Sequence, residues 1–380
     1  MSDITLLDDV FADVIEQPLT NRFATYGLNR NPFPGNEEEF YGFVIGQNAA
    51  KAEFKNRLEH FVRTRVVGAV LVEADHRVGK TNFLKFYHHR LKEMYDREVR
   101  RSPGTACLPL YTNVYEYDFF FLYQQIVQNI PDSAIDQAAK SVSTAPLGTI
   151  HSDTDMSRAL NKFGQLYPVM NDQERLERTN LFKRWLRGGY RSLNKDERDI
   201  LNVQENVTNS PVGPRFLRDF LEILNEREIL SGFILFLDEF ERLVGAGISR
   251  SQKDRYLNDI RNFMSDFQAG VFFCFAITPG AYQELQRLYP AIPPRLGTRL
   301  MLREISTEAE ALEFAHSYIQ WFRANSGVTK VPASGSFPPL LSDDQISNIY
   351  LRLQQRFTKN VPQGHLLAAL RDDAEKVVSR

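Results

Sequence analysis

The sequence predicts an α/β protein with a parallel sheet, a mostly helical insertion and a helical domain at its C-terminal end. Continuous apolar runs, typical of strands buried on both faces of a parallel sheet, recur along most of the chain. Helical patterns separate these runs, and after about Arg303 only helical patterns follow. The runs are residues 66–73, 105–114, 233–237 and 270–278.

Length and composition indicate an ordinary globular protein. The 380 residues suffice for two or three domains, and 43% hydrophobic with 25% charged residues exclude a disordered or collagen-like chain. The formal net charge of −2 excludes a chain that is polybasic as a whole. Any basic surface for nucleic acid must therefore be local.

Cysteines and chain ends bear on location. Cys107 and Cys274 lie far apart inside apolar runs, which is typical of reduced, buried thiols. No Cys/His cluster in the sequence indicates a zinc site. The stretch MSDITLLDDVFADVIEQ lacks a signal-peptide pattern, and the run DFFFLY is too short to span a bilayer. We therefore expect a cytoplasmic protein with no membrane partner.

The elements of the first half follow from local patterns. Residues 1–40 form a leader in which proline and glycine interrupt regular structure. A helix is predicted between Gln47 and Arg65, where apolar residues recur at helical spacing. VVGAVLVE then predicts a strand, GKTNFLKFYHHRLKEMY a helix and TACLPLYTNV a second strand. Asp118 can cap the next helix, FFFLYQQIVQNI.

This alternation of strand and helix breaks between about 131 and 214. The stretch is polar and mostly helical, so we interpret it as an insertion. Beyond it, RFLRDFLEILNERE predicts a helix, FILFLDEFERL a strand, DRYLNDIRNFMSDF a helix and GVFFCFAIT a strand. The predicted domains are a leader over 1–40, an α/β core over 41–303 and a helical lid over 304–380.

The stretch VLVEADHRVGKTNFLKF has the pattern of a phosphate-binding loop. A strand ends, the backbone curls and a helix begins, so successive N–H groups and the helix N-terminus attract a polyphosphate. The lysine of such a loop reaches the β- and γ-phosphates, and the next hydroxyl, here Thr81, is a ligand of Mg²⁺. We predict that ATP and Mg²⁺ bind here. The predicted binding residues are Ala74, Asp75, His76, Arg77, Val78, Gly79, Lys80, Thr81 and Asn82.

The first half of this loop departs from the usual glycine-rich pattern. Ala74 stands where a glycine is common, and His76 and Arg77 fill the middle. Because backbone N–H groups make the phosphate contacts, side chains are tolerated wherever φ stays negative. Arg77 can add positive charge near the phosphates or face a neighbouring subunit.

Acidic and hydroxyl side chains follow two other apolar runs. Asp238 and Glu239 end FILFLDE, at the strand end where α/β sheets place their sites. We predict that Asp238 holds the nucleotide's Mg²⁺ through water and that Glu239 polarises the attacking water. The alternative is an acidic strand end that faces solvent. Thr278, after FFCFAI, is predicted to touch the γ-phosphate or the water, or else only to cap the following helix.

Together these motifs resemble AAA+ P-loop ATPases, especially the origin-recognition-complex and ExeA-like branch. The segment YGLNRNPF is similar to the one preceding the ATPase core there, and VIGQNAAKAEF to the adenine-side motif, with Ile45 and Gly46 in matching positions. Lys80 and Thr81 match Walker A. Asp238 and Glu239 match Walker B, and Thr278 matches sensor 1. The resemblance covers roughly residues 26–118 and 215–310.

The insertion narrows the resemblance. WLRGGYRSLNKDERDILNV, with the strand and helix patterns after it, is similar to ATP-binding proteins of BREX-type phage-defence islands. The resemblance implies an ATP-hydrolysing, magnesium-dependent AAA+ switch or motor that forms homo-oligomers. It also implies action on DNA or on protein subunits of a defence or transposition system. The alternatives are a nucleotide-dependent scaffold with little turnover and a signalling ATPase that does not bind DNA.

Arginines complete the catalytic set that the resemblance implies. An arginine finger, which acts on the phosphate of a neighbouring subunit, is sought in PPRLGTRLMLR, where Arg295 and Arg299 are the candidates. The alternative for both is surface ion pairing. The usual sensor 2 arginine is replaced by Gln363 after Pro362, and Arg371 is a weak substitute.

A basic stretch with aromatic residues lies between Glu174 and Lys195. It could neutralise phosphates and stack bases through Trp185 and Tyr190. The alternative, which we favour, is a solvated helical face whose Trp185 and Leu186 point into the core. The basic residues are Arg175, Arg178, Lys183, Arg184, Arg187, Arg191 and Lys195.

Overall fold

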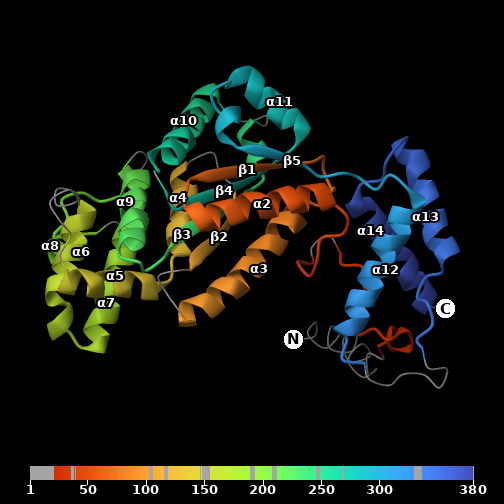
Figure 1. The fold of residues 1–380 in the computed structure, drawn as a ribbon, viewed down its shortest axis with the longest axis horizontal. Coiled ribbons are helices and arrows are strands. Elements are labelled where there is room, and N and C mark those ends of the chain that lie inside the picture. Colours follow the sequence, from red (N-terminus) through yellow and green to blue (C-terminus); the bar gives the residue numbers. More distant parts are fainter. Residues whose placement is uncertain are drawn as a thin grey trace, which may run out of the picture. The chain divides into compact units, whose positions relative to one another are not determined.

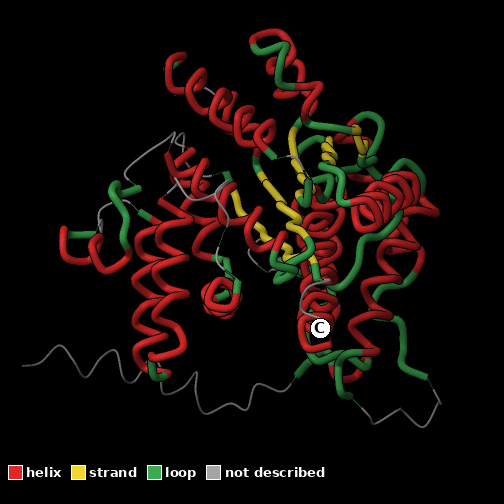
Figure 2. The backbone as a smooth tube through the Cα atoms, turned by 60° about the vertical axis from the view of Figure 1, so that its left-hand side comes forward, coloured by secondary structure: helices red, strands yellow, loops and turns green. Residues whose placement is uncertain are grey.

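Backbone contacts divide the chain into two compact units, which are described separately. The first comprises residues 47–303 and the second residues 1–46 with 304–380. Figures 1 and 2 show the computed structural model. It describes residues 21–35, 38, 40–101, 106–114, 119–145, 147, 155–188, 193–207, 212–244, 249–267, 269–328 and 336–379.

The larger unit is built on a parallel sheet with the strand order β2-β3-β4-β1-β5. β3 and β4 are buried along their whole length, as expected of strands covered on both faces. The predicted parallel α/β fold is therefore confirmed. The strands are β1 (Gly68–Glu73), β2 (Cys107–Asn113), β3 (Gly232–Asp238), β4 (Val271–Ile277) and β5 (Thr298–Met301).

Helices cover both faces of this sheet (Figure 1). On one face lie α2 (Asn48–Thr64) and α3 (Lys80–Arg101), where the ring of Phe54 contacts those of Phe83 and Phe272 edge to face. On the other face, Phe273 meets Phe263 of α10 (Arg250–Asp266) edge to face. Successive residues of β4 thus point to opposite faces, as the strand pleat requires.

The predicted insertion is a helical bundle between α4 (Phe119–Gln128) and α9 (Val212–Glu226). Its buried residues belong to the same apolar core as those of the sheet. Figure 2 shows the bundle as a group of red helices beside the yellow strands. Asp118, the predicted cap of α4, lies outside the described residues. The bundle comprises α5 (Asp132–Thr144), α6 (Asp155–Leu166), α7 (Asp172–Arg187) and α8 (Lys195–Leu201).

The smaller unit combines helices α12 (Glu308–Ala324), α13 (Asp343–Phe357) and α14 (Gln363–Val378) with the N-terminal segment. Leu28 and Phe33 are fully buried in its core, and the Asn31 amide donates hydrogen bonds to Glu375 Oε1 (2.8 Å) and to the Arg371 carbonyl (3.2 Å). The domain division predicted from sequence therefore differs at the N-terminal side, because the described residues up to Gly46 belong with the C-terminal helices.

Candidate functional site

The carboxyl ends of β1, β4 and β3 bring the predicted site residues to one edge of the sheet. Glu73, the last residue of β1, is aligned with Ile277 of β4, and the Ala74 N–H donates to the Ile277 carbonyl (3.2 Å). On the other side of β4, Leu237 is aligned with Phe275. The phosphate-loop pattern, Thr278 and Asp238 thus follow three adjacent strands, as binding sites do in open α/β sheets.

The loop between β1 and α3 has the curled backbone that its pattern predicts. Gly79, just before α3, has φ +103°, a value that side chains other than glycine rarely adopt. Val78 is buried, whereas Asp75, His76 and Arg77 are exposed. No acidic residue lies in the first turn of α3, so the helix N-terminus is left positive for an anion.

Two substituted loop positions behave differently. Ala74 is buried and is not among the residues with positive φ, so replacing glycine there requires no left-handed backbone. Arg77 has φ +65°. The expected reason for tolerating a side chain, a negative φ, therefore does not apply to this residue. A residue other than glycine is unfavourable in this left-handed backbone conformation, and residues held in such conformations concentrate at functional sites.

The ammonium group of Lys80 is buried against oxygen atoms of its own loop. Its side chain donates hydrogen bonds to the carbonyls of Ala74 (2.9 Å) and Asp75 (3.3 Å). Glu241 Oε1 lies 3.7 Å from Lys80 Nζ. Lys80 is therefore held at the base of the loop, where it would have to exchange these oxygens for those of a phosphate.

Asp238 is buried at the end of β3 and held in a fixed orientation. Its carboxylate accepts hydrogen bonds from the Tyr111 hydroxyl (2.8 Å) and from the Glu239 N–H (2.8 Å). Tyr111, from β2, also donates to Asn113 Oδ1 (3.1 Å). Tyr111 was not predicted from the sequence, because nothing local distinguishes a tyrosine in a buried strand from a packing residue.

Glu239 and Glu241 occupy the turn after β3 with different partners. Glu239 has φ +59° and its carboxylate lies 2.7 Å from Arg242 Nε. Glu241, which was not predicted from the sequence, faces Lys80 instead. Burial raises the pKa of Glu241; nearby Asp238 also raises it, whereas Lys80 and His76 lower it. The second glutamate of the DEFE sequence was the available signal.

Thr278 lies at the N-cap of α11 (Pro279–Leu288). Thr278 is buried, and among the described residues its side chain makes no hydrogen bond that caps α11. Simple capping therefore does not account for its hydroxyl. Its position between the ends of β1 and β3 is where a contact with phosphate or water is predicted.

The two candidate arginine fingers differ in their surroundings. Arg299 lies on β5 and forms a bidentate pair with buried Glu73 (2.7 and 2.8 Å), while its guanidinium stacks 4.4 Å from the centre of the Tyr282 ring. Arg295 is exposed and donates to the Ala291 carbonyl (2.6 Å). Ion pairing, the alternative weighed from sequence, therefore describes Arg299.

The residues available for Mg²⁺ fit an ion whose coordination shell is completed by waters and by the phosphates of the substrate. Thr81 is exposed at the start of α3 and Asp238 offers a carboxylate, both being the hard oxygen ligands that Mg²⁺ prefers. Among the described residues no group of three or more His, Cys, Asp or Glu side chains could hold a metal ion. Mg²⁺ is usually bound by one or two protein oxygens, waters and substrate phosphates.

Three other predicted residues belong to the smaller unit. Ile45 and Gly46 end the N-terminal part of the smaller unit, where Ile45 packs against the apolar core. Arg371 is held within that unit by the Phe33 carbonyl and Glu38 Oε1, each 3.0 Å away.

No helix of the described residues is both long and apolar enough to cross a membrane.

The basic stretch of the insertion is mostly α7, and its aromatic residue is structural. Trp185 is 1% exposed, packs on Phe216 of α9 and donates from Nε1 to the Glu205 carbonyl (2.9 Å). Leu186 is also buried. The alternative favoured from sequence, in which both residues point into the core, agrees with this packing. Tyr190 and Arg191 lie outside the described residues.

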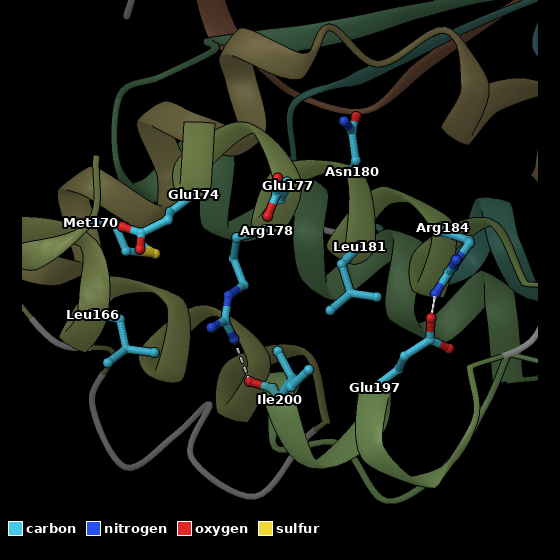
Figure 3. A pocket seen from close by; sticks show the side chains of 10 residues that line it. All are labelled: Leu166, Met170, Glu174, Glu177, Arg178, Asn180, Leu181, Arg184, Glu197 and Ile200. Carbon is cyan, nitrogen blue, oxygen red and sulfur yellow. Dashed lines mark hydrogen bonds and ion pairs between the residues drawn. The ribbon is translucent and has the colours of Figure 1, made fainter. Parts of the chain in front are cut away.

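Several cations of α7 are engaged within the bundle. Arg184 pairs with Glu197, Lys183 with Asp132, and Arg178 donates to the Ile200 carbonyl. Figure 3 shows the first and last of these contacts across a pocket of about 610 Å³ between α7 and α8. Apolar side chains share its lining with these charges: Leu166, Met170, Leu181 and Ile200.

Comparisons with known proteins identify the family. No curated protein matches the sequence. Two solved structures of the ORC2 protein of Aeropyrum pernix are similar at 12% identity: one, with ADPNP and ADP, covers 90% of this chain and 71% of that chain with a TM-score of 0.41, and the ADP form covers 93% and 73% with 0.42. These likenesses are remote. The model of the BREX system ATP-binding protein BrxC/D family matches residues 55–320, which include the phosphate loop, the insertion, the Asp238-Glu239 pair and Thr278, and the chain belongs to this family.

Proposed function

We propose that the protein is an ATP-hydrolysing AAA+ switch that forms homo-oligomers and acts in phage defence on DNA or on a DNA-bound partner. The observation that supports this most is the alignment of the phosphate loop, Thr278 and Asp238 at the ends of three adjacent strands. Membership of a BREX ATP-binding family supports the defence role.

Each residue of the edge has a role in this proposal. Lys80 moves from the loop carbonyls to the β- and γ-phosphates, and the loop N–H groups hold the rest of the chain of phosphates. Glu239 leaves Arg242 to polarise the attacking water, and Thr278 orients that water. Thr81 and Asp238 would hold Mg²⁺, which would supply positive charge to neutralise the phosphate oxygens.

The arginine from a neighbouring subunit is assigned to Arg295. Arg299 is the weaker candidate, because releasing it would leave the buried carboxylate of Glu73 without its partner, and an unpaired buried charge is strongly unfavourable. Arg295 releases only a carbonyl contact and is exposed. The Arg295→Ala variant should therefore lose ATPase activity while still binding ATP.

A multiple-turnover ATPase assay on the wild type and on Glu239→Gln, with and without DNA, tests the proposal. We expect turnover that Glu239→Gln abolishes. The competing function is a nucleotide-dependent scaffold, which the positive φ of Arg77 and the lysine held by its own loop favour. Absence of turnover under every condition, together with ATP-dependent assembly, would establish the scaffold function and refute the proposed ATP-hydrolysing switch.

Direct binding to DNA has less support than binding to a protein partner. The paired side chains of Lys183, Arg184 and Arg178 offer little free charge for phosphates. A signalling ATPase that contacts only proteins is therefore the second alternative. Co-purification of tagged protein from cells carrying the whole defence locus, with nuclease treatment, separates a DNA-bridged partner from a direct protein partner.

A further inference from the structure

The turn after β3 contains a carboxylate for which the proposed chemistry has no role. This turn, η5 (Phe240–Val244), is anchored by Phe240, whose ring lies 5.0 Å from that of Phe275 on β4. Leu243 and Val244 are buried beside it. Glu241 follows Phe240 in this packed turn, and its side chain is 19% exposed, with Oε1 3.7 Å from Lys80 Nζ. Its position is thus set by the fold rather than by chance on a mobile surface.

Glu241 and a polyphosphate require the same ammonium group. Lys80 has three N–H donors, and its neighbours are the Ala74 and Asp75 carbonyls and Glu241 Oε1. The phosphate loop functions by presenting Lys80 to the β- and γ-phosphates. Incoming phosphates must therefore displace the carboxylate and then remain near its negative charge.

We propose that Glu241 sets the nucleotide affinity of this site by holding Lys80 in the nucleotide-free protein and opposing the charge of the β- and γ-phosphates. It acts through Lys80 and is a positioning residue, distinct from Glu239, which pairs with Arg242. This inference rests on nucleotide binding at the phosphate loop, and it is independent of whether ATP is turned over.

The competition also predicts which nucleotides are affected. Of the two phosphates that Lys80 reaches, ATP carries both, ADP carries the β-phosphate, and AMP carries neither. Removing the Glu241 charge should thus strengthen the binding of ADP and of an ATP analogue and leave AMP unchanged. A residue that merely stabilised the turn would have the opposite effect, because loosening the turn weakens all nucleotides alike.

Calorimetric titration of the full chain with Mg²⁺ and ADP, the β,γ-imido analogue of ATP, or AMP tests the inference. For Glu241→Gln, which keeps the shape of the side chain, we expect about tenfold tighter binding of the first two, the order of effect of removing one partly screened charge. The matched control is Glu59→Gln, which removes the same charge from a half-buried position on α2. It should leave all affinities unchanged.

The outcomes distinguish a failure of the role assigned to Glu241 from a failure of nucleotide binding at the loop. If the wild type binds none of these nucleotides, nucleotide binding at the loop itself fails. If the wild type binds and Glu241→Gln binds ADP and the analogue equally or more weakly, the assigned role of Glu241 is refuted. Glu241→Ala serves as the second variant, since it removes the same charge without leaving an amide that could bond to Lys80.

Discussion

Two groups of basic side chains in the larger unit lie in opposite settings. Lys80 is a single cation buried among carbonyls beside a helix N-terminus, where the backbone itself favours an anion. On α7 several cations are clustered, and Lys183 and Arg184 are engaged by carboxylates of the same bundle. The comparison teaches that the backbone and partners around a cation, rather than the number of cations, indicate where phosphate binds.

The strongest test of the α7 side is Trp185→Ala. Trp185 packs on Phe216 and Phe182 in the core, so its loss should lower the free energy of unfolding by about 3–5 kcal/mol. Urea denaturation followed by circular dichroism measures this. Leu176→Ala, at an exposed position of the same helix, is the control and should change stability by less than about 0.5 kcal/mol. Normal stability with weakened nucleic-acid binding would show that Trp185 stacks on bases instead.

On the side of the phosphate loop, Lys80→Ala should weaken the binding of the ATP analogue by about 100-fold, the loss expected for a buried charge contact to phosphate. Equilibrium binding by calorimetry gives this value. Lys85→Ala is the control on the same helix, because Lys85 lies 5.6 Å from the Tyr111 ring rather than in the loop. Equal losses in the two variants would mean that the loop lysine has no special role.

His88 tests the packing that supports the loop from α3. The pKa of His88 is lowered to about 4, chiefly by burial and then by the nearby Lys92 and His89, whereas a backbone hydrogen bond with Pro109 acts to raise it. Since the folded state binds the proton less readily than the unfolded state, stability should be full above the ordinary pKa of about 6.5 and fall between there and pH 4. The loss amounts to about 2 kcal/mol after allowing for partial exposure.

Denaturation of wild type and His88→Phe across this pH range measures that slope. The replacement keeps the ring that contacts Tyr111 and Phe236 and cannot be protonated. The difference in stability between the two proteins should therefore grow in favour of His88→Phe as the pH falls. A difference that does not depend on pH would contradict the assignment to His88.

Much of the fold could be predicted from sequence because its signals are local. β1, β3 and β4 contain continuous apolar runs, and Asp238 ends β3 while Thr278 directly follows β4. β5 escaped prediction because it is an edge strand with only Leu300 buried, and such a strand shows no apolar run.

The missed parts of the site depend on contacts between distant segments. Tyr111 and Asp238 are joined across two strands, and Glu241 becomes significant only because the turn after β3 approaches the loop. The φ of Arg77 likewise follows from the loop's curl, whereas its residue type predicts the opposite. Sequence patterns thus predict which residues form the candidate site, but only tertiary structure assigns partners to its charges.

The smallest expected effect concerns the cations of α7. The double variant Lys183→Gln and Arg184→Gln removes two charges that the bundle engages through Asp132 and Glu197. Retention on double-stranded DNA, measured as the logarithm of the binding constant against that of salt concentration, should keep its slope. A cation that neutralised one DNA phosphate would, on removal, reduce the magnitude of the slope by about 0.9. A reduction near that value per charge would place DNA on α7 and remove the distinction between these cations and Lys80, because Lys183 and Arg184 would then leave their carboxylates for phosphate.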